Sequence, residues 1–248
     1  MIDRDSKRQH LKDYRSHYAT DAKAIVGPTF LNPHWRASEL RRTEFLVKKL
    51  KLKPGHNVLD VGCGSGWLSK QCLKHDANVF PIDLGILGVK GARERYPEVG
   101  HFQVGDVYKL PFVDSVFDSL VLSEVLEHLE NVSMALRESR RVIKDGGHVM
   151  ISVPYRENII EHLCIHCNRL TPGNAHLHSF ESNTLVQTCK DAGLIVEEVY
   201  LICNKFLEIL GFPLFSVRWP HSVWNGIDKI ANKILFKPSF VAVRARKI

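Results

Sequence analysis

Three glycines at alternate positions follow a short apolar run in the segment VLDVGCGSGWLS, residues 58–69. Gly62, Gly64 and Gly66 have no Cβ, which permits tight backbone turns and lets a ligand approach the main chain closely. In an open parallel sheet, the first strand-to-helix turn is a usual binding place for a nucleotide or phosphate. The segment therefore predicts a strand, a glycine turn and a helix that together bind a nucleoside-sized ligand.

Strands and helices alternate along most of the chain. Strands are expected at residues 57–61, 77–82, 101–104, 119–122, 148–153, 194–200 and 240–244, and helices at 37–50, 65–75, 86–94, 132–143, 183–192 and 223–235. This alternation is typical of βαβ units in a mostly parallel sheet with helices on both faces. The prediction is a doubly wound, Rossmann-like α/β fold with seven strands, the last of them an antiparallel closing strand at a sheet margin.

The length of 248 residues fits one α/β domain with additions. A single domain is predicted for residues 1–248. Its parts are an N-terminal arm and helix (1–52), a cofactor-binding core (53–154), a Cys- and His-rich insertion (155–180) and a C-terminal part (181–248) with a second insertion at 202–238. In the helix at 37–50, Arg41 and Arg42 are expected to face outward. Substrate specificity is expected to reside in the two insertions.

The formal net charge of +7 is spread along the chain. Because no block of basic residues gathers it, a nucleic-acid partner is not predicted. The first residues are charged and contain no apolar segment of a signal peptide, and no run reaches the roughly 18 apolar residues of a membrane span. Six scattered cysteines without an export signal disfavour disulfides. We expect a cytoplasmic protein; its oligomeric state does not follow from the sequence.

The glycine spacing G-x-G-x-G differs from the G-x-G-x-x-G of dinucleotide sites. With Asp60 before it, the segment resembles motif I of the class I S-adenosylmethionine-dependent methyltransferases, in particular the type 11 and ubiquinone-biosynthesis O-methyltransferases. The segments VFPIDLG, VGDVYKLPF, FDSLVLSEVLEHL and RVIKDGGHVMISVP resemble the later motifs of that family in the same order, over residues 52–199. The resemblance implies an enzyme that transfers a methyl group from S-adenosylmethionine.

The resemblance also implies where the cofactor is held. Asp60 would orient the methionine amine, directly or through water, Asp83 would accept hydrogen bonds from the ribose hydroxyls, and Asp106 would pair with the adenine amino group. Leu84 would pack on the adenine. The predicted cofactor-binding residues are Asp60, Gly62, Cys63, Gly64, Gly66, Asp83, Leu84, Asp106, Val107 and Ser123. Taken singly, an aspartate at a strand end is often only a helix cap or turn residue, and Cys63 also suits packing.

Two carboxylates and an imidazole follow the strand expected at 119–122, in the segment SEVLEHL. On a helical turn, the spacing of Glu124, Glu127 and His128 would place all three on one face. His128, with an unperturbed pKa of about 6.5, suits a general base at neutral pH, and His128 and Glu124 are the predicted catalytic residues. The same spacing resembles the divalent-metal site of ubiquinone-biosynthesis and small-RNA 2′-O-methyltransferases. A base, a metal site and a purely structural role all remain open.

A second group of candidate ligands lies in the insertion at 155–180. Cys164, Cys167, His176 and His178 are ligand types that suit tetrahedral zinc. The alternatives are free thiols in an ordinary lid, or a lid from which His176 or His178 reaches into the active site. Structural zinc bound by these four residues is therefore one expectation.

Apolar residues alternate with lysines from residue 223 to residue 237. Such a stripe is typical either of a helix that covers its own core or of peripheral contact with an anionic membrane. The methyl acceptor is expected to be a small or lipid-like molecule with an acceptor oxygen. Two other functions stay open: a nicotinamide-dependent oxidoreductase, against which the glycine spacing argues, and a binding module of methyltransferase fold without catalysis.

Overall fold

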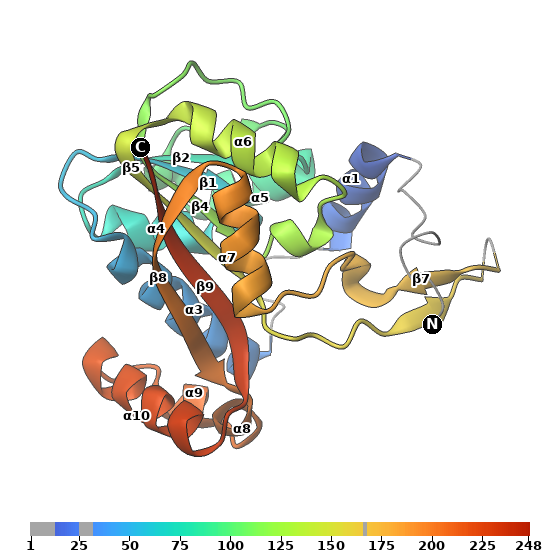
Figure 1. Ribbon diagram of the computed structural model, residues 1–248, viewed down its shortest axis with the longest axis vertical. Coiled ribbons are helices and arrows are strands. Elements are labelled where there is room, and N and C mark those ends of the chain that lie inside the picture. Colours follow the sequence, from blue (N-terminus) through green and yellow to red (C-terminus); the bar gives the residue numbers. More distant parts are fainter. Residues whose placement is uncertain (1–12, 25–31, 166–167) are drawn as a thin grey trace.

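The computed structural model describes residues 13–24, 32–165 and 168–248, and its core is one seven-stranded sheet (Figure 1). The strands stand in the order β3-β2-β1-β4-β5-β9-β8. Their bounds are β1 Asn57–Val61, β2 Asn78–Asp83, β3 Gln103–Val104, β4 Phe117–Ser123, β5 Ile143–Pro154, β8 Leu194–Asn204 and β9 Pro238–Lys247. All seven predicted strands are confirmed, with ends that differ by a few residues.

The sheet is parallel except at β9. β1 pairs in parallel with β2 and β4, and β4 pairs in parallel with β5. β9 runs antiparallel to both of its neighbours, β5 and β8. The predicted doubly wound sheet with an antiparallel last strand is therefore confirmed. The expected place of that strand at the sheet margin is wrong, because β8 pairs with the outer edge of β9 and forms the margin itself. Because the parallel strands end at one edge, the turns after β1, β2 and β4 lie side by side there.

Helices cover both faces of the sheet. Their bounds are α1 Tyr14–Ala24, α3 Pro33–Leu50, α4 Trp67–Leu73, α5 Ile86–Arg95, α6 Val132–Val142, α7 Ser182–Asp191, α8 Lys205–Ile209, α9 Phe212–Ser216 and α10 His221–Ile234, with 3₁₀ turns η2 Pro97–Val99, η3 Leu126–His128 and η4 Gly173–Ala175. The six helices expected from the sequence are present. Within the described ranges, none of the helices is long and apolar enough to cross a membrane.

Alternation along the strands divides the core into two clusters. In β1, Val58 packs with side chains of α3 and α4, whereas Leu59 and Val61 point to the opposite face and pack with those of α6 and α7. Successive residues of a strand point to opposite faces, so a buried strand of this kind needs apolar residues throughout. Asp60 is the one buried charged residue in β1. A buried carboxylate among apolar residues indicates a functional role.

The two predicted insertions take different forms. Within 155–180, β6 Glu161–Leu163 and β7 Leu170–Pro172 form an antiparallel hairpin, which projects from the body on the side of α1 (Figure 1). Within 202–238, α8, α9 and α10 gather at one end of the molecule, by the ends of β8 and β9 (Figure 1). The domain boundaries given above stay predictions.

The expectation that Arg41 and Arg42 face outward is wrong. Both side chains are buried, with 7% and 4% of their surface exposed. The Arg41 guanidinium lies over the ring of Phe212 at 4.7 Å and that of Trp224 at 5.2 Å. Arginine stacks well on aromatic faces. Phe212 and Trp224, which lie far along the chain, therefore stabilise the buried side chain of Arg41.

Candidate active site

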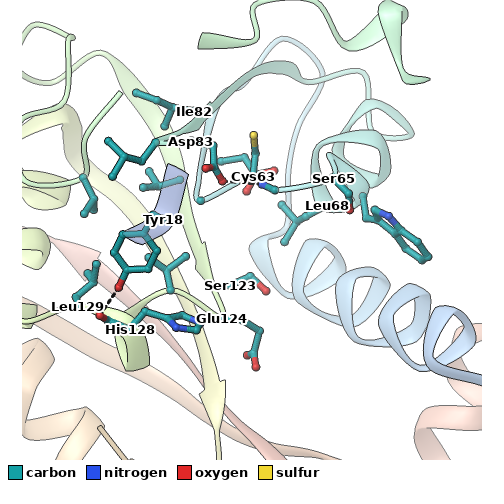
Figure 2. A pocket seen from close by; sticks show the side chains of 18 of the residues that line it. Tyr18, Cys63, Ser65, Leu68, Ile82, Asp83, Ser123, Glu124, His128 and Leu129 are labelled. Atoms are coloured by element: carbon teal, nitrogen blue, oxygen red, sulfur yellow. Dashed lines mark hydrogen bonds between the residues drawn. The ribbon is translucent and has the colours of Figure 1, made fainter. Parts of the chain in front are cut away.

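A cavity of about 470 Å³ opens at the edge of the sheet where β1, β2 and β4 end (Figure 2). This volume lies within the usual range for a small-molecule site. Every predicted cofactor-binding residue except Gly66 lines it, as do the predicted catalytic residues Glu124 and His128. The sequence motifs therefore converge on one space, although they come from separate strand ends.

The glycine turn has two structural requirements of its own. Gly62, Gly64 and Gly66 all have positive φ, at 72°, 47° and 80°, a region that residues with a Cβ rarely adopt. A Cβ at Gly62 would lie 2.4 Å from Val125 Cγ2, whereas a Cβ at Gly64 would meet nothing within 4 Å. Only Gly64 therefore leaves open space towards the cavity. At Gly62, the side chain of Val125 occupies the space that a Cβ would need.

Two aspartates border this turn. Asp83, at the end of β2, accepts hydrogen bonds from the backbone N–H of Gly64 at 2.9 Å and of Gly85 at 2.8 Å. Asp60 is buried and accepts a hydrogen bond from the Ser69 hydroxyl. Burial raises the pKa of Asp60 to about 6, and the Ser69 hydrogen bond opposes that rise. A cationic ligand group near Asp60 would favour its ionised form.

Asp106 meets the N-terminal helix α1 across the cavity. Its Oδ2 accepts a hydrogen bond from the Tyr14 hydroxyl at 2.6 Å and from Arg15 Nη2 at 3.0 Å. Its Oδ1 accepts one from the backbone N–H of Tyr108 at 3.0 Å. The predicted adenine-binding carboxylate is thus engaged by α1, so a ligand amino group there would share or replace the Tyr14 contact.

A buried arginine organises the end of β4. Arg42 Nη1 donates to Ser123 Oγ at 2.7 Å and lies 3.1 Å from Glu124 Oε1, while its Nη2 contacts Glu39 Oε2 at 2.5 Å. Burial raises the pKa of Glu124 to about 7, against the effect of the Arg42 charge, which lowers it. Glu124 can therefore exist in either protonation state near neutral pH.

The helical turn expected for Glu124, Glu127 and His128 is only partly formed. Glu124 has a φ of 56° and lies outside the short 3₁₀ helix η3, which begins at Leu126. The three side chains consequently do not share one helical face. Glu124 turns to Arg42, Glu127 is buried, and His128 lines the cavity.

His128 lies between α1 and the loop before α7. Its Nδ1 faces the carbonyl oxygen of Ala175 at 3.3 Å, and its backbone oxygen accepts a hydrogen bond from the Tyr18 hydroxyl (Figure 2). Since a carbonyl only accepts, Nδ1 carries the hydrogen and Nε2 keeps the lone pair. Burial lowers the pKa of His128 to about 4, and the nearby His176 adds to this effect. The imidazole is neutral at pH 7.

Glu127, His128 and His176 bring three possible metal-ligand atoms within 4.8 Å of one another, the one such group among the described residues. Glu127 is fully buried, and neither of its carboxylate oxygens has a hydrogen-bond partner on another described residue. Burial raises its pKa well above the usual range. Two imidazoles and one carboxylate suit a transition metal such as zinc better than magnesium.

The predicted zinc ligands of the 155–180 insertion divide between two places. His176 Nδ1 contacts the Glu157 carboxylate, and its ring stands edge-on to that of His128 at 4.6 Å. His178 Nε2 lies 2.8 Å from the carbonyl oxygen of Leu129. Cys164 lies at the end of the β6–β7 hairpin, and Cys167 is outside the described residues. His176 therefore contacts the ring of His128. The reach of a histidine into the active site and the zinc site both stay predictions.

The N-terminal part of the chain contributes cavity residues that the sequence motifs do not indicate. They are Tyr14, Tyr18, Trp35, Glu39, Arg42 and Thr43. The adjacent arginines at 41 and 42 in an otherwise amphipathic helix were the one visible signal, because a charge on the inward side of such a helix needs a buried partner. The tyrosines and Trp35 belong to no motif.

Residues 59–151 match the protein family described as "Methyltransferase domain". A demethylmenaquinone methyltransferase of Streptomyces griseus is 36% identical over 99 residues, which cover 40% of this chain and 43% of that protein. A malonyl-[acyl-carrier protein] O-methyltransferase of Erwinia pyrifoliae is 36% identical over 102 residues, 40% of this chain and 38% of that protein. The matches thus span less than half the length of either relative.

A solved structure of the [4+2]-cyclase SpnF has a similar fold. It aligns with a TM-score of 0.62 and 19% identity, covering 84% of this chain and 81% of that one. At this identity the likeness shows the fold alone. The reaction must therefore be argued from the cavity and its residues.

Proposed function

We propose that this chain, which belongs to the class I S-adenosylmethionine-dependent methyltransferases, transfers a methyl group from S-adenosylmethionine to an oxygen of a small or lipid-like acceptor. One observation carries the proposal: Asp60, Gly64, Asp83 and Asp106 line the same cavity as His128. A nucleoside site and a possible base thus share one space. The O-methyltransferase among the relatives supports the choice of an oxygen acceptor.

The residues around the cavity fit this cofactor. The buried carboxylate of Asp60 suits the methionine ammonium group, and the open space at Gly64 leaves room for the amino-acid portion. Two backbone N–H groups orient the carboxylate of Asp83 at the end of β2, and a carboxylate in this position suits the ribose hydroxyls as their acceptor. Asp106 would take the adenine amino group, and Leu84 would pack on the ring.

S-adenosylmethionine, when bound, supplies a methyl group on a positively charged sulfur, so the leaving group is already activated. The chain must then hold the acceptor oxygen in line and at near-attack distance, which contributes several kcal/mol to lowering the barrier. It must also take up the acceptor's proton. We infer that His128 Nε2 takes this proton, since His128 is neutral and its Nδ1 is committed to Ala175.

The low pKa of His128 is compatible with this role in a cavity that holds a sulfonium ion. Before transfer the positive charge is on sulfur, and after transfer it is on the imidazole, so the net charge of the cavity does not change. Glu124, which lines the same cavity, can stabilise the imidazolium in its ionised form. Arg42 favours that form.

A divalent cation held by Glu127, His128 and His176 is the second candidate for activating the acceptor. The unpaired carboxylate of Glu127 favours it. A cation there would act as a Lewis acid on the acceptor hydroxyl. Dialysis against a chelator distinguishes the two candidates: base catalysis by His128 predicts unchanged turnover, whereas loss of turnover that zinc or manganese restores supports the cation. Elemental analysis of the same samples also tests the predicted zinc site of the insertion.

The proposed function is tested without knowledge of the acceptor. The protein is incubated with a metabolite and lipid extract and with S-adenosylmethionine carrying a deuterated methyl group. We expect at least one compound to gain the labelled methyl, and none to do so with the His128→Ala variant. Cofactor binding without any labelled product from a broad set of extracts would favour the non-catalytic binding module.

A further inference from the structure

Helix α10 buries polar side chains and exposes apolar ones, the reverse of an ordinary surface helix. Its inward face buries the polar residues Asp228 and Asn232 together with Trp224. Asp228 accepts hydrogen bonds from the backbone N–H of Asn204 at 2.6 Å and of Cys203 at 3.0 Å, which fixes α10 to the end of β8. The apolar stripe of this helix is therefore free to face solvent.

The exposed apolar residues of this end of the molecule form what we call the apolar end surface: Ile209, Leu210, Phe215, Ile230, Ile234 and Phe236. Ile209 is 82%, Phe215 75% and Ile234 73% exposed. They come from α8, α9, α10 and the adjoining turns, which lie together in Figure 1. Soluble monomers rarely expose so many large apolar side chains in one region unless they bind something.

Within residues 205–237, the exposed charged side chains are all positive. Residues 205–237 contain Lys205, Arg218, Lys229, Lys233 and Lys237, all exposed. The two acids of this stretch are used internally: Asp228 holds β8, and Glu208 accepts a hydrogen bond from Ser239 at 2.6 Å. Exposed apolar residues among lysines on an amphipathic helix are suited to an anionic lipid surface.

A second cavity lies between the apolar end surface and the candidate active site. Its volume is about 520 Å³, and Lys205 and Ile209 of α8 line it together with Glu157 and His176. Glu124 lines both this cavity and the first one. A molecule that enters beside α8 can therefore extend towards the predicted reaction centre.

We propose that α8, α9 and α10 dock the protein on an anionic lipid bilayer through the apolar end surface and the exposed lysines of residues 205–237. In the docked position the second cavity faces the bilayer, so an acceptor embedded in lipid reaches Glu124 without crossing water. The route for the acceptor rests on the proposed function, whereas docking itself does not.

Docking is tested by co-sedimentation with vesicles of phosphatidylcholine alone and of equal parts phosphatidylcholine and phosphatidylglycerol. We expect binding to the anionic vesicles only, and weaker binding as salt is added. Two variants probe the surface: Ile230→Ser/Ile234→Ser removes apolar side chains, and Lys229→Glu/Lys233→Glu reverses two charges. Each should weaken vesicle binding more than about tenfold.

Matched controls are Val113→Ser and Lys190→Glu, exposed residues on other parts of the chain. They should bind vesicles as the unaltered protein does. Because the altered residues are exposed, thermal unfolding should show all variants folded.

The proposal is overturned if the protein does not bind anionic vesicles, or if the surface variants bind them as well as the controls. A dimer in solution that the Ile230→Ser/Ile234→Ser variant dissociates, without vesicle binding, would assign the surface to a second copy instead. Binding that persists in a variant lacking methyl transfer would separate docking from catalysis.

Discussion

Arg42 Nη1 lies 3.1 Å from Glu124 Oε1, and this ion pair joins helix α3 to the end of β4. Helix α3 therefore builds part of the candidate active site and does not merely cover it. Arg42 is buried and also holds Glu39 and Ser123. Since burial alone raises the pKa of Glu124, the Arg42 charge is what allows Glu124 to ionise near neutral pH.

Replacing Arg42 with alanine should destabilise the protein most at alkaline pH. Without the guanidinium, the pKa of Glu124 rises above its present value of about 7. At pH 8 the variant must then bury an unpaired carboxylate or keep it protonated, and removal of one partner of a buried pair costs roughly 3 to 5 kcal/mol. At pH 5 Glu124 is protonated in both proteins, so the loss should be smaller. Denaturant unfolding at both pH values measures this, with exposed Arg36→Ala as control. An equal loss at both pH values would contradict it.

The Glu127→Gln variant should gain stability relative to the unaltered protein as the pH rises from 5 to 8. The pKa of Glu127 is raised by burial above its ordinary value of 4.5. Over this interval Glu127 is ionised in the unfolded chain but keeps its proton in the folded protein, so unfolding releases a proton and the stability of the unaltered protein falls as the pH rises. Glutamine does not titrate, and the expected relative gain is about 1.4 kcal/mol or more.

Denaturant unfolding also measures this effect, and Glu94→Gln on the exposed side of α5 is the matched control. A relative loss of stability for Glu127→Gln would mean that Glu127 is ionised in the folded protein. That result would support a bound cation beside His128 and His176.

Replacing His128 with alanine should reduce turnover far more than cofactor affinity. Loss of a general base typically lowers the rate by about 10² to 10⁴. S-adenosylmethionine affinity should stay within a few fold, since the predicted contacts to the cofactor come from Asp60, Asp83 and Asp106. His75→Ala, which removes an imidazole outside the cavity lining, is the control. Full turnover in the His128→Ala variant would remove His128 from the mechanism.

The Asp83→Ala variant should bind S-adenosylmethionine about 1 to 3 kcal/mol more weakly. It loses the proposed ribose contacts, and it also leaves the N–H groups of Gly64 and Gly85 without their acceptor. Titration calorimetry measures the change, with the exposed Asp114→Ala variant as control. Unchanged affinity would show that the ribose does not lie against the end of β2.

Much of the fold follows from local patterns in the sequence. The strands around Asp60 and Asp83 alternate with helices at regular spacing, and the glycine turn with positive φ values has a clear local signal. The parallel sheet then brings the ends of β1, β2 and β4 to one edge, which places most of the predicted cofactor residues around one cavity.

The parts that sequence reasoning missed depend on contacts distant along the chain. Tyr14 reaches Asp106, and Arg42 reaches Glu124, but no motif marks Tyr14 or Arg42. The apolar stripe of helix α10 is compatible with a side that faces the core and with a side that faces a membrane, and the anchoring of Asp228 to the end of β8 turns that stripe outward. A pattern shows that a helix has two faces, and only packing decides which face is buried.

Titration calorimetry of the protein with S-adenosylmethionine, and separately with NAD, tests the central claim most directly. The cavity with Asp60, Gly64 and Asp83 predicts saturable binding of S-adenosylmethionine at one site and no binding of NAD. Binding of NAD without binding of S-adenosylmethionine would contradict the account.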